Sequence, residues 1–477
     1  MDNRAETIRS WAEDNFGAAH LSDERRVDRV VTIGEAMASH AGKTIPQMFA
    51  SIYDVKAAYN LFKHEEATPE NLQAGHREKV LLAMSESGVY LLVEDTTAMS
   101  WSGNEPIIGL GPIGGGTEGL QGFLLHSVLA MRWTFELSET DDLKRPPVEI
   151  LGIAHQKSFV RKKKSKRKKK ETSYQRKRAS RECESNRWED SVRGLEEPEA
   201  GVRYVHVADR EADIYEYLLA CQEQGHGYVV RAAQNRALHN SQTGRREGRL
   251  FEEARAAEEL GSFKLKLRSR KGVAGRRAEL KVSVVRVLLS PPKSSQASEP
   301  IECSVIRVWE ENAPAGLEPL EWILLTDSQV GVFEQSLECV LQYVTRWVIE
   351  EFHKALKTGL KAESLQLEHA KRLFAAIAIK SVVALRLIDL KERVRIDEAK
   401  PAEESSLSEL ELQVLRTTTK KPLKTVKDVA LQIGRLGGHM NRKADGMPGW
   451  ITLWRGMEKL RLLVEGVGIA HTLTKFG

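Results

Sequence analysis

The 477-residue sequence contains only four cysteines, Cys183, Cys221, Cys303 and Cys339, and none lies in a CxxC or Cys/His spacing. This scarcity argues against a disulfide framework and against a zinc site, and it fits a reducing cytosol. A Walker A motif is also missing, so we expect neither ATP hydrolysis nor a nucleotide cofactor.

Long hydrophobic runs are rare. The first residues are charged and lack the apolar segment of a secretory signal. The longest apolar stretch, residues 373–388, is broken by Lys380 and Arg386, which predicts a core helix rather than a membrane span. Net charge is only +5, from 72 Lys and Arg against 67 Asp and Glu, so affinity for nucleic acid must come from local patches. We expect a cytoplasmic protein without a membrane partner.

A glycine-rich segment, residues 109–114, fits the G-x-G-x-x-G pattern of dinucleotide sites. Pro112 and the following Gly115 and Gly116 oppose the helix that such a site needs, and a predicted strand comes next. We interpret the segment as a flexible loop.

The segment YVTRWVIEEFHKALKTG contains four residues that bind phosphate or metal ions in proteins: Tyr343, Arg346, Glu350 and Lys357. On one helix their spacing places them within a stripe of roughly 60°. The residues expected to bury against a sheet lie on the opposite side: Phe352, Ala355 and Leu356. A carboxylate between phosphate-seeking groups suggests phosphoryl transfer on nucleic acid. The alternative is a solvated helix face with i, i+4 charge pairs.

Two aspartates follow apolar runs. Asp95 comes after residues 89–93 and Asp209 after residues 204–208, and each run predicts a buried strand that stops at an acidic residue. Buried carboxylates are costly unless they hold a cation. With Glu350 they supply three hard oxygen ligands, which suit magnesium or manganese rather than zinc.

The strand order favours bringing these carboxylates together. Two further strand-like runs, residues 122–131 and 148–155, lie between the aspartates without room for long crossover helices. We predict a mixed sheet that begins with an antiparallel meander. With Asp95 on the central first strand and Asp209 on a neighbour, the Glu350 helix need only cross the sheet.

These segments resemble the DDE transposases with a ribonuclease-H-like core, specifically the cut-and-paste group of the Tn-five transposase. The similar segments are LLVEDTT around Asp95, HVADREADIYEYL around Asp209, LEWILLTD around Trp322, and the run that carries the Y-x2-R-x3-E-x6-K signature. GFLLHSV, ILGIAHQ and RLGGHMNRKADGMPGWITLW are also similar.

The resemblance implies an α/β fold: a ribonuclease-H-like mixed-sheet catalytic core with a β-rich insert, flanked by helical N- and C-terminal domains. It implies that Asp95, Asp209 and Glu350 hold two divalent cations, Mg²⁺ with Mn²⁺ as a substitute. The expected reactions are nicking of transposon ends, hairpin formation and opening, and strand transfer into target DNA. Bacterial cytoplasm, in association with the nucleoid, is the expected location.

Further roles follow from the same resemblance. Tyr343, Arg346 and Lys357 are expected to hold phosphates near the hairpin. Trp322 is our candidate for stacking a base that has swung out of the duplex, although a lone Trp in a strand is usually core.

Residues 1–70 predict a small helical domain, and the resemblance implies that it binds the transposon end. Residues 68–70, Thr-Pro-Glu, predict the start of the next helix. Arg26 and Arg29 are the candidate DNA contacts, and the alternative is a solvated helix start.

Residues 71–370 predict the catalytic core, with a β-rich insert at about 240–325. Strand-like runs in the insert alternate apolar residues with Lys and Arg, so one face is expected to pack and the other to be basic. A loop at 157–181 contains the run RKKKSKRKKK, residues 161–170, with Lys163 and Lys168 as candidate contacts to duplex DNA. The alternative is an inert solubilising loop.

Residues 371–477 predict a helical C-terminal domain. Its final block contains Trp450, Trp454 and Leu460, and an amphipathic helix there needs a partner surface. The alternatives are intramolecular packing and, as in the resembled family, pairing of two subunits. We therefore expect a homodimer in the synaptic complex with double-stranded DNA.

Two rival functions remain at this stage. A metal-dependent nuclease with the same core cuts without joining. A non-catalytic DNA-binding descendant needs no carboxylates, and the presence of Asp95, Asp209 and Glu350 argues against it.

Overall fold

The structure is a computed structural model that describes most of the chain. The described residues are 8–102, 106–114, 120–134, 142–161, 184–267, 275–293, 295, 297–405, 407–442 and 445–473.

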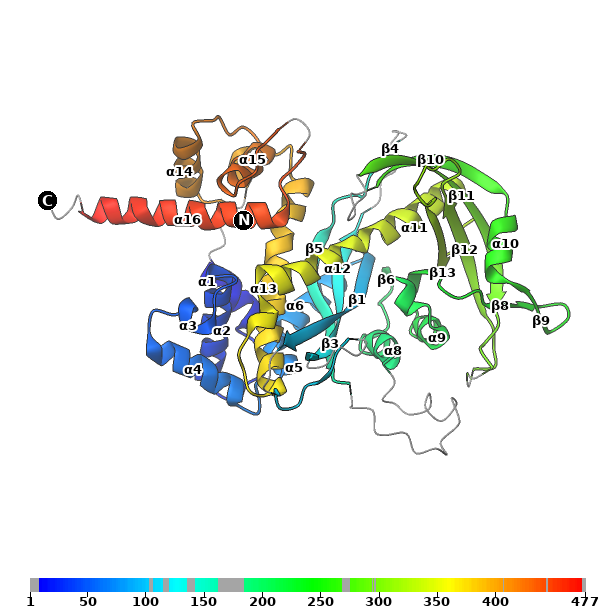
Figure 1. Cartoon of the computed structure of the whole chain (residues 1–477), viewed down its shortest axis with the longest axis horizontal. Coiled ribbons are helices and arrows are strands. Elements are labelled where there is room, and N and C mark those ends of the chain that lie inside the picture. The colour runs from blue at the N-terminus through cyan, green and yellow to red at the C-terminus, as the bar shows by residue number, and fades with distance from the viewer. Residues whose placement is uncertain are drawn as a thin grey trace.

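A mixed β-sheet runs through the molecule (Figure 1). Its strands are β1 (Gly88–Ser102), β2 (Gly111–Pro112), β3 (Leu120–Trp133), β4 (Asp142–Leu143), β5 (Glu149–Phe159), β6 (Val202–Ala208), β7 (Gly227–Arg231), β8 (Ala237–Asn240), β9 (Arg245–Arg249), β10 (Glu259–Leu267), β11 (Arg276–Leu289), β12 (Ile301–Trp309) and β13 (Glu321–Thr326). The main path is β2-β3-β1-β6-β7-β13-β12-β11-β10-β4, with β5 also paired to β3.

The predicted antiparallel meander is confirmed. β1 pairs antiparallel with β3 and β3 with β5, whereas β6 adds to the other side of β1 in parallel. The prediction that the first strand stops at Asp95 is wrong, because β1 runs on past this residue. The strand continues to Ser102 because β3 pairs with it beyond Asp95↔Ser127, so the backbone hydrogen bonds carry it past the carboxylate.

The β-rich insert extends the same sheet. β13 pairs antiparallel with β7, and β12, β11 and β10 follow outward. The predicted alternation is confirmed in β10, where Phe263 and Leu265 are buried and Lys264 and Lys266 are exposed. The glycine-rich segment interpreted as a loop contains β2, which pairs with β3.

Helices cover both faces of the central strands. The helices of this part are α6 (Ala74–Met84), α8 (Asn186–Arg193), η1 (Arg210–Ala212), α9 (Tyr215–Glu223), α10 (Leu250–Ala256), α11 (Phe333–Thr345), α12 (Trp347–Lys354), η2 (Ala355–Gly359) and η3 (Ala362–Ser364). Leu91 and Val93 of β1 share a core with α11 and α12. Tyr90 and Leu92 point to the opposite face and pack with α6. Neighbouring residues of β1 therefore meet different helices.

The run from Tyr343 to Lys357 is not one regular helix, which corrects the prediction. At Arg346 the α-helical pattern gives way to tighter bonds, Arg346 N–H to Tyr343 O and Ile349 N–H to Arg346 O. Lys357 lies in η2, a π-helical turn closed by Leu360 N–H donating to Ala355 O. The predicted burial of Phe352, Ala355 and Leu356 is confirmed.

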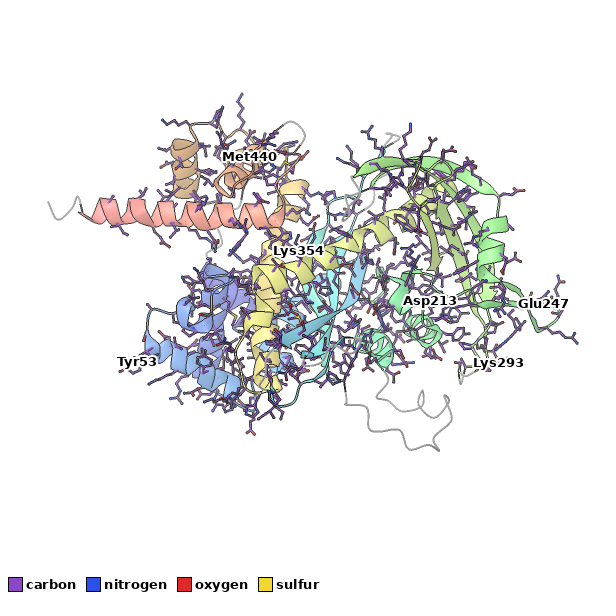
Figure 2. The ribbon with its side chains drawn as sticks, viewed as in Figure 1. Tyr53, Asp213, Glu247, Lys293, Lys354 and Met440 are labelled. Atoms are coloured by element: carbon purple, nitrogen blue, oxygen red, sulfur yellow. The ribbon has the colours of Figure 1, made fainter. Side chains whose placement is uncertain are left out.

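The N-terminal region is helical. Its helices are α1 (Ile8–Phe16), α2 (Glu24–Ser39), α3 (Ile45–Met48), α4 (Ile52–Lys63) and α5 (Pro69–Leu72). The predicted start at residues 68–70 is confirmed, because the Thr68 side chain accepts from Asn71 N–H and Pro69 begins α5. Tyr53 of α4 points outward and is 79% exposed (Figure 2).

The C-terminal region is also helical. It comprises α13 (Ala370–Ile396), η4 (Ala402–Glu404), α14 (Glu409–Thr419), α15 (Val426–Leu436) and α16 (Trp450–Leu473). α13 crosses the molecule and is buried over most of its length, as predicted for residues 373–388. Among the described residues, no helix has the length and apolarity needed to cross a membrane. Leu460 of α16 is buried and Leu462 is exposed.

Candidate active site

The parallel pairing of β1 and β6 places Asp95 opposite Asp209. Val93 pairs with Val207, and the backbone is still extended at Asp209, so the same offset carried two residues further aligns the aspartates. Paired residues on neighbouring parallel strands share a face and lie about 5 Å apart. Two carboxylates that are distant in sequence therefore meet on the α12 face of the sheet.

The pKa of Asp95 reflects the nearness of Asp209. Burial raises the pKa of the Asp95 carboxyl, and the negative charge of Asp209 raises it further, to about 7. Glu350 adds to the rise, while Arg346 and the Thr96 N–H oppose it. A carboxyl whose pKa is raised by burial and by neighbouring negative charge favours a bound proton or a cation beside it.

Glu350 comes from α12, which packs against β1. Its Oε1 lies 3.1 Å from Arg346 Nη2, and Arg346 Nη1 lies 3.6 Å from Asp95 Oδ2. Arg346 thus stands between two of the three carboxylates. That Nη1 atom is buried and has no hydrogen-bond partner within the described residues.

His353 lies one turn after Glu350. Its Nδ1 is 3.9 Å from Asp95 Oδ2. Burial lowers the pKa of His353 to about 3, helped by the charge of Lys357, so the ring is neutral at physiological pH. No HExxH spacing in the sequence marks His353 as a metal ligand.

The donor chemistry fits a divalent cation. Asp95, Asp209 and Glu350 offer only carboxylate oxygens, the ligands that Mg²⁺ and Mn²⁺ prefer. Their mutual repulsion is what a cation relieves. Across the described part of the chain, no three His, Cys, Asp or Glu side chains are arranged to hold a metal ion directly. Glu350 instead pairs with Arg346, so it would have to leave that partner to join the aspartates.

The other residues of the predicted stripe are Lys357 and Tyr343. Lys357 Nζ donates to the carbonyl of Ala98 on β1 and lies 3.7 Å from Glu363. Tyr343 is buried, and its ring packs edge-on against Trp322 at 5.4 Å between centroids. Trp322 is therefore partly core and next to the stripe.

The N-terminal arginines make intramolecular contacts. Arg26 donates to Ser22 Oγ and to Glu66, and Arg29 lies 2.7 Å from Asp54. Both side chains remain about one-third exposed, at 34% and 30%. They sit on the first two turns of α2.

The predicted basic loop begins later than expected. Residues 157–159 belong to β5, paired with β3, and Lys157 binds Asp190. Lys163 and Lys168 lie outside the described residues. Arg161 and Glu184, at the two ends of the undescribed stretch, form a bidentate ion pair.

Residues 8–67 match a family model described as transposase DNA-binding. The match supports a transposase. It spans α1 to α4 and includes Arg26 and Arg29, so it also supports DNA as a partner of this region. A transposase family suggests a DNA-processing enzyme, and the α/β fold with its mixed sheet and helical ends is consistent with that.

A buried polar network behind the aspartates was not anticipated from sequence. Its centre is Glu94, which accepts hydrogen bonds from His126, His206, Ser191 and Tyr217. The signal was present, since Glu94 directly precedes Asp95 in a run that is otherwise apolar up to that point. Because side chains alternate along a strand, Glu94 points to the face opposite Asp95.

Proposed function

We propose that the chain is a DDE transposase of the Tn-five type with a ribonuclease-H-like core, catalysing cut-and-paste transposition. The observation that carries the proposal is the β1/β6 register, which brings Asp95 opposite Asp209 beneath the helix that presents Glu350. The N-terminal match to a transposase DNA-binding model supports the substrate.

In this proposal Asp95, Asp209 and Glu350 hold two divalent cations, Mg²⁺ or Mn²⁺. A pair of cations held by these carboxylates would supply activation of the attacking oxygen and stabilisation of the leaving oxygen in an in-line displacement. Arg346 is then released from its carboxylate partners and binds a DNA phosphate with its planar fork. Lys357, held beside β1 at Ala98, adds a second positive charge to the phosphates near the same strand.

The nucleophile sets the product. With water the strand is nicked and a 3′-hydroxyl remains; with that hydroxyl the site forms a hairpin on the transposon end and later joins the end to target DNA. Trp322 and Tyr343 form an aromatic pair next to Arg346, and we assign Trp322 the stacking of a base displaced by the hairpin. The site of action is the bacterial nucleoid, and a homodimer synapses two ends.

Replacing Glu350 with Gln tests the proposal. We expect loss of nicking because a neutral amide cannot replace an anionic ligand, while gel-shift binding to the end sequence persists. Glu351→Gln is the matched control, since Glu351 binds Lys391 through both carboxylate oxygens. Nicking that survives Glu350→Gln contradicts the assignment.

A joining assay with pre-nicked ends separates the transposase from a nuclease of the same core. The transposase joins the free 3′-hydroxyl to a second duplex, whereas a nuclease only cuts. Absence of joining by a protein that nicks would favour the nuclease.

A further inference from the structure

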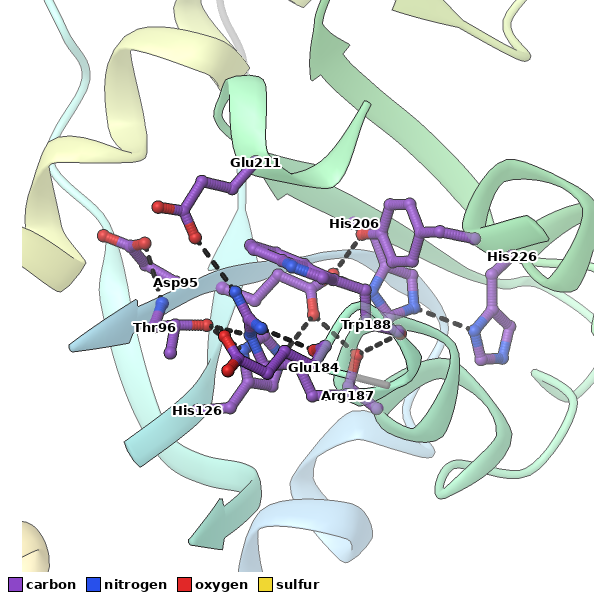
Figure 3. Close-up of polar contacts among 12 residues, drawn as sticks. Asp95, Thr96, His126, Glu184, Arg187, Trp188, His206, Glu211 and His226 are labelled. Atoms are coloured by element: carbon purple, nitrogen blue, oxygen red, sulfur yellow. Dashed lines mark hydrogen bonds and ion pairs between the residues drawn. The ribbon is translucent and has the colours of Figure 1, made fainter. Parts of the chain in front are cut away.

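Arg187 is a buried arginine at the start of α8, on the face of the sheet opposite Glu350. Its side chain is 9% exposed. Nε donates to Thr96 Oγ1 at 2.8 Å, and Nη2 donates to Glu211 Oε2 at 3.0 Å (Figure 3). Nη1 donates to the carbonyl of Glu184. One guanidinium thus joins β1 to the turn that follows β6.

The two side chains that Arg187 binds belong to residues that hold the aspartates. Thr96 N–H donates to Asp95 Oδ1 at 2.7 Å. Glu211 N–H donates to Asp209 Oδ1 at 2.8 Å. Each carboxylate is therefore oriented by a backbone N–H whose own residue is fixed by the same arginine.

We propose that Arg187 is a positioning residue that sets Asp95 and Asp209 relative to each other. The inference rests on the proposed function, because it assigns Arg187 to the support of that same site. Arg187 does not touch DNA or the reacting atoms; it acts through Thr96 and Glu211.

Neighbouring buried side chains fix the position of Thr96, to which Arg187 donates. Thr96 Oγ1 is also 2.9 Å from His126 Nδ1, and His126 Nε2 is 3.1 Å from Glu94 Oε2. Trp188 packs edge-on against His126 at 4.7 Å between ring centroids. Thr96 is consequently held by the Glu94 network on one side and by Arg187 on the other. Arg187 itself is 9% exposed, whereas its partner Glu211 is 58% exposed, so the buried packing holds the Thr96 end of these contacts.

The three hydrogen bonds made by Arg187 need the several donors of an arginine side chain, and a positive charge alone is not sufficient. A guanidinium presents donors in a fixed planar fork, so it reaches a hydroxyl and a carboxylate at once. A lysine in the same place keeps the charge but has a single nitrogen. Arg187→Lys therefore separates the positioning geometry from the charge.

The first test measures cation binding directly. Mn²⁺ binding to the full chain without DNA is followed by electron paramagnetic resonance, alongside thermal unfolding. We expect Arg187→Lys and Thr96→Val to weaken Mn²⁺ binding about ten- to a hundred-fold, as for other groups that orient metal ligands. Thr96→Val keeps the shape of the side chain and covers the case in which Arg187→Lys fails to fold.

Arg193→Lys is the control on the same helix. Arg193 binds Glu189 and Glu223 on the surface, away from the aspartates, and its variant should bind Mn²⁺ like wild type. Nicking assays at rising Mg²⁺ provide the second readout. The Arg187→Lys enzyme should need more Mg²⁺ for half-maximal nicking and should bind end DNA normally.

A double variant tests the route. Because Arg187 acts through Thr96 and Glu211, Arg187→Lys combined with Thr96→Val should lose little more Mn²⁺ affinity than Arg187→Lys alone. Additive losses would overturn this route, and wild-type Mn²⁺ affinity in Arg187→Lys with only a lower melting temperature would overturn the role. A wild-type protein that binds no Mn²⁺ and does not nick overturns the proposed function and this inference together.

Discussion

Glu94 and Asp95 are adjacent in sequence and lie on opposite faces of the same strand, in contrasting environments. Glu94 is fully buried and receives four hydrogen-bond donors. Burial alone would raise its pKa, but His206 and His126 outweigh that effect and hold the pKa of Glu94 well below its usual range. Burial raises the pKa of Asp95, and the negative charges of Asp209 and Glu350 raise it further, to about 7.

Ionised Glu94 therefore stabilises the fold, whereas ionised Asp95 destabilises it. On the face that carries Glu94, hydrogen bonds from protein groups compensate the negative charge. On the α12 face, Asp95, Asp209 and Glu350 lie together, with Arg346 between Asp95 and Glu350. Charge that the protein does not neutralise is typical of a site that awaits a cation or substrate.

The largest expected effect on stability is at Glu94. Glu94→Gln places an amide among donors that require an acceptor, and we expect a loss of about 3–5 kcal/mol in the free energy of unfolding. The loss should be full above pH 4.5, the ordinary value for Glu, and should shrink as pH falls below it, because the lowered pKa stabilises only the ionised form.

Chemical denaturation across pH measures this effect. Glu86→Gln is the control, since Glu86 pairs with Arg132 at a side chain that is 68% exposed, and its change should stay within about 0.5 kcal/mol. Equal effects at the two positions would remove the contrast between the faces.

Asp95→Asn should act in the opposite direction. A raised carboxyl pKa means that the folded protein binds a proton more tightly than the unfolded chain, so ionised Asp95 costs stability. The cost is absent below pH 3.8 and complete above about pH 7. We expect Asp95→Asn to stabilise the metal-free protein by up to about 4 kcal/mol at pH 8 and by little at pH 4.

Thermal unfolding without divalent cations checks this prediction, and nicking should be lost in the same variant. Added Mg²⁺ should stabilise wild type and not Asp95→Asn. A destabilised Asp95→Asn at pH 8 would show that Asp95 is satisfied like Glu94.

Ser191→Ala should give the smallest effect. It removes one of the four donors to Glu94 and leaves three in place. We expect a loss of about 1.5–3 kcal/mol, the range of a hydrogen bond to a charged group. Denaturation at pH 7 measures it, and a loss as large as that of Glu94→Gln would mean that the network depends on Ser191 rather than on the carboxylate.

Sequence by itself determined the local elements. Hydrophobic runs located β3, β5, β6 and β12, the alternating pattern located β10, and the cap at Thr68 placed the start of α5, because each depends on neighbouring residues in the chain. It also determined that Phe352, Ala355 and Leu356 are buried, since helical period alone puts them on one face.

Only the tertiary structure decided what surrounds each carboxylate. β1 runs past Asp95 because β3 pairs with it, and the parallel offset to β6 aligns Asp209; neither partner strand is local. The interruption at Arg346, the π turn at Lys357 and the contacts of Arg187 likewise depend on packing between segments far apart in the chain. A residue's type fixes its possible chemistry, but its charge state and partners depend on long-range contacts that no local pattern encodes.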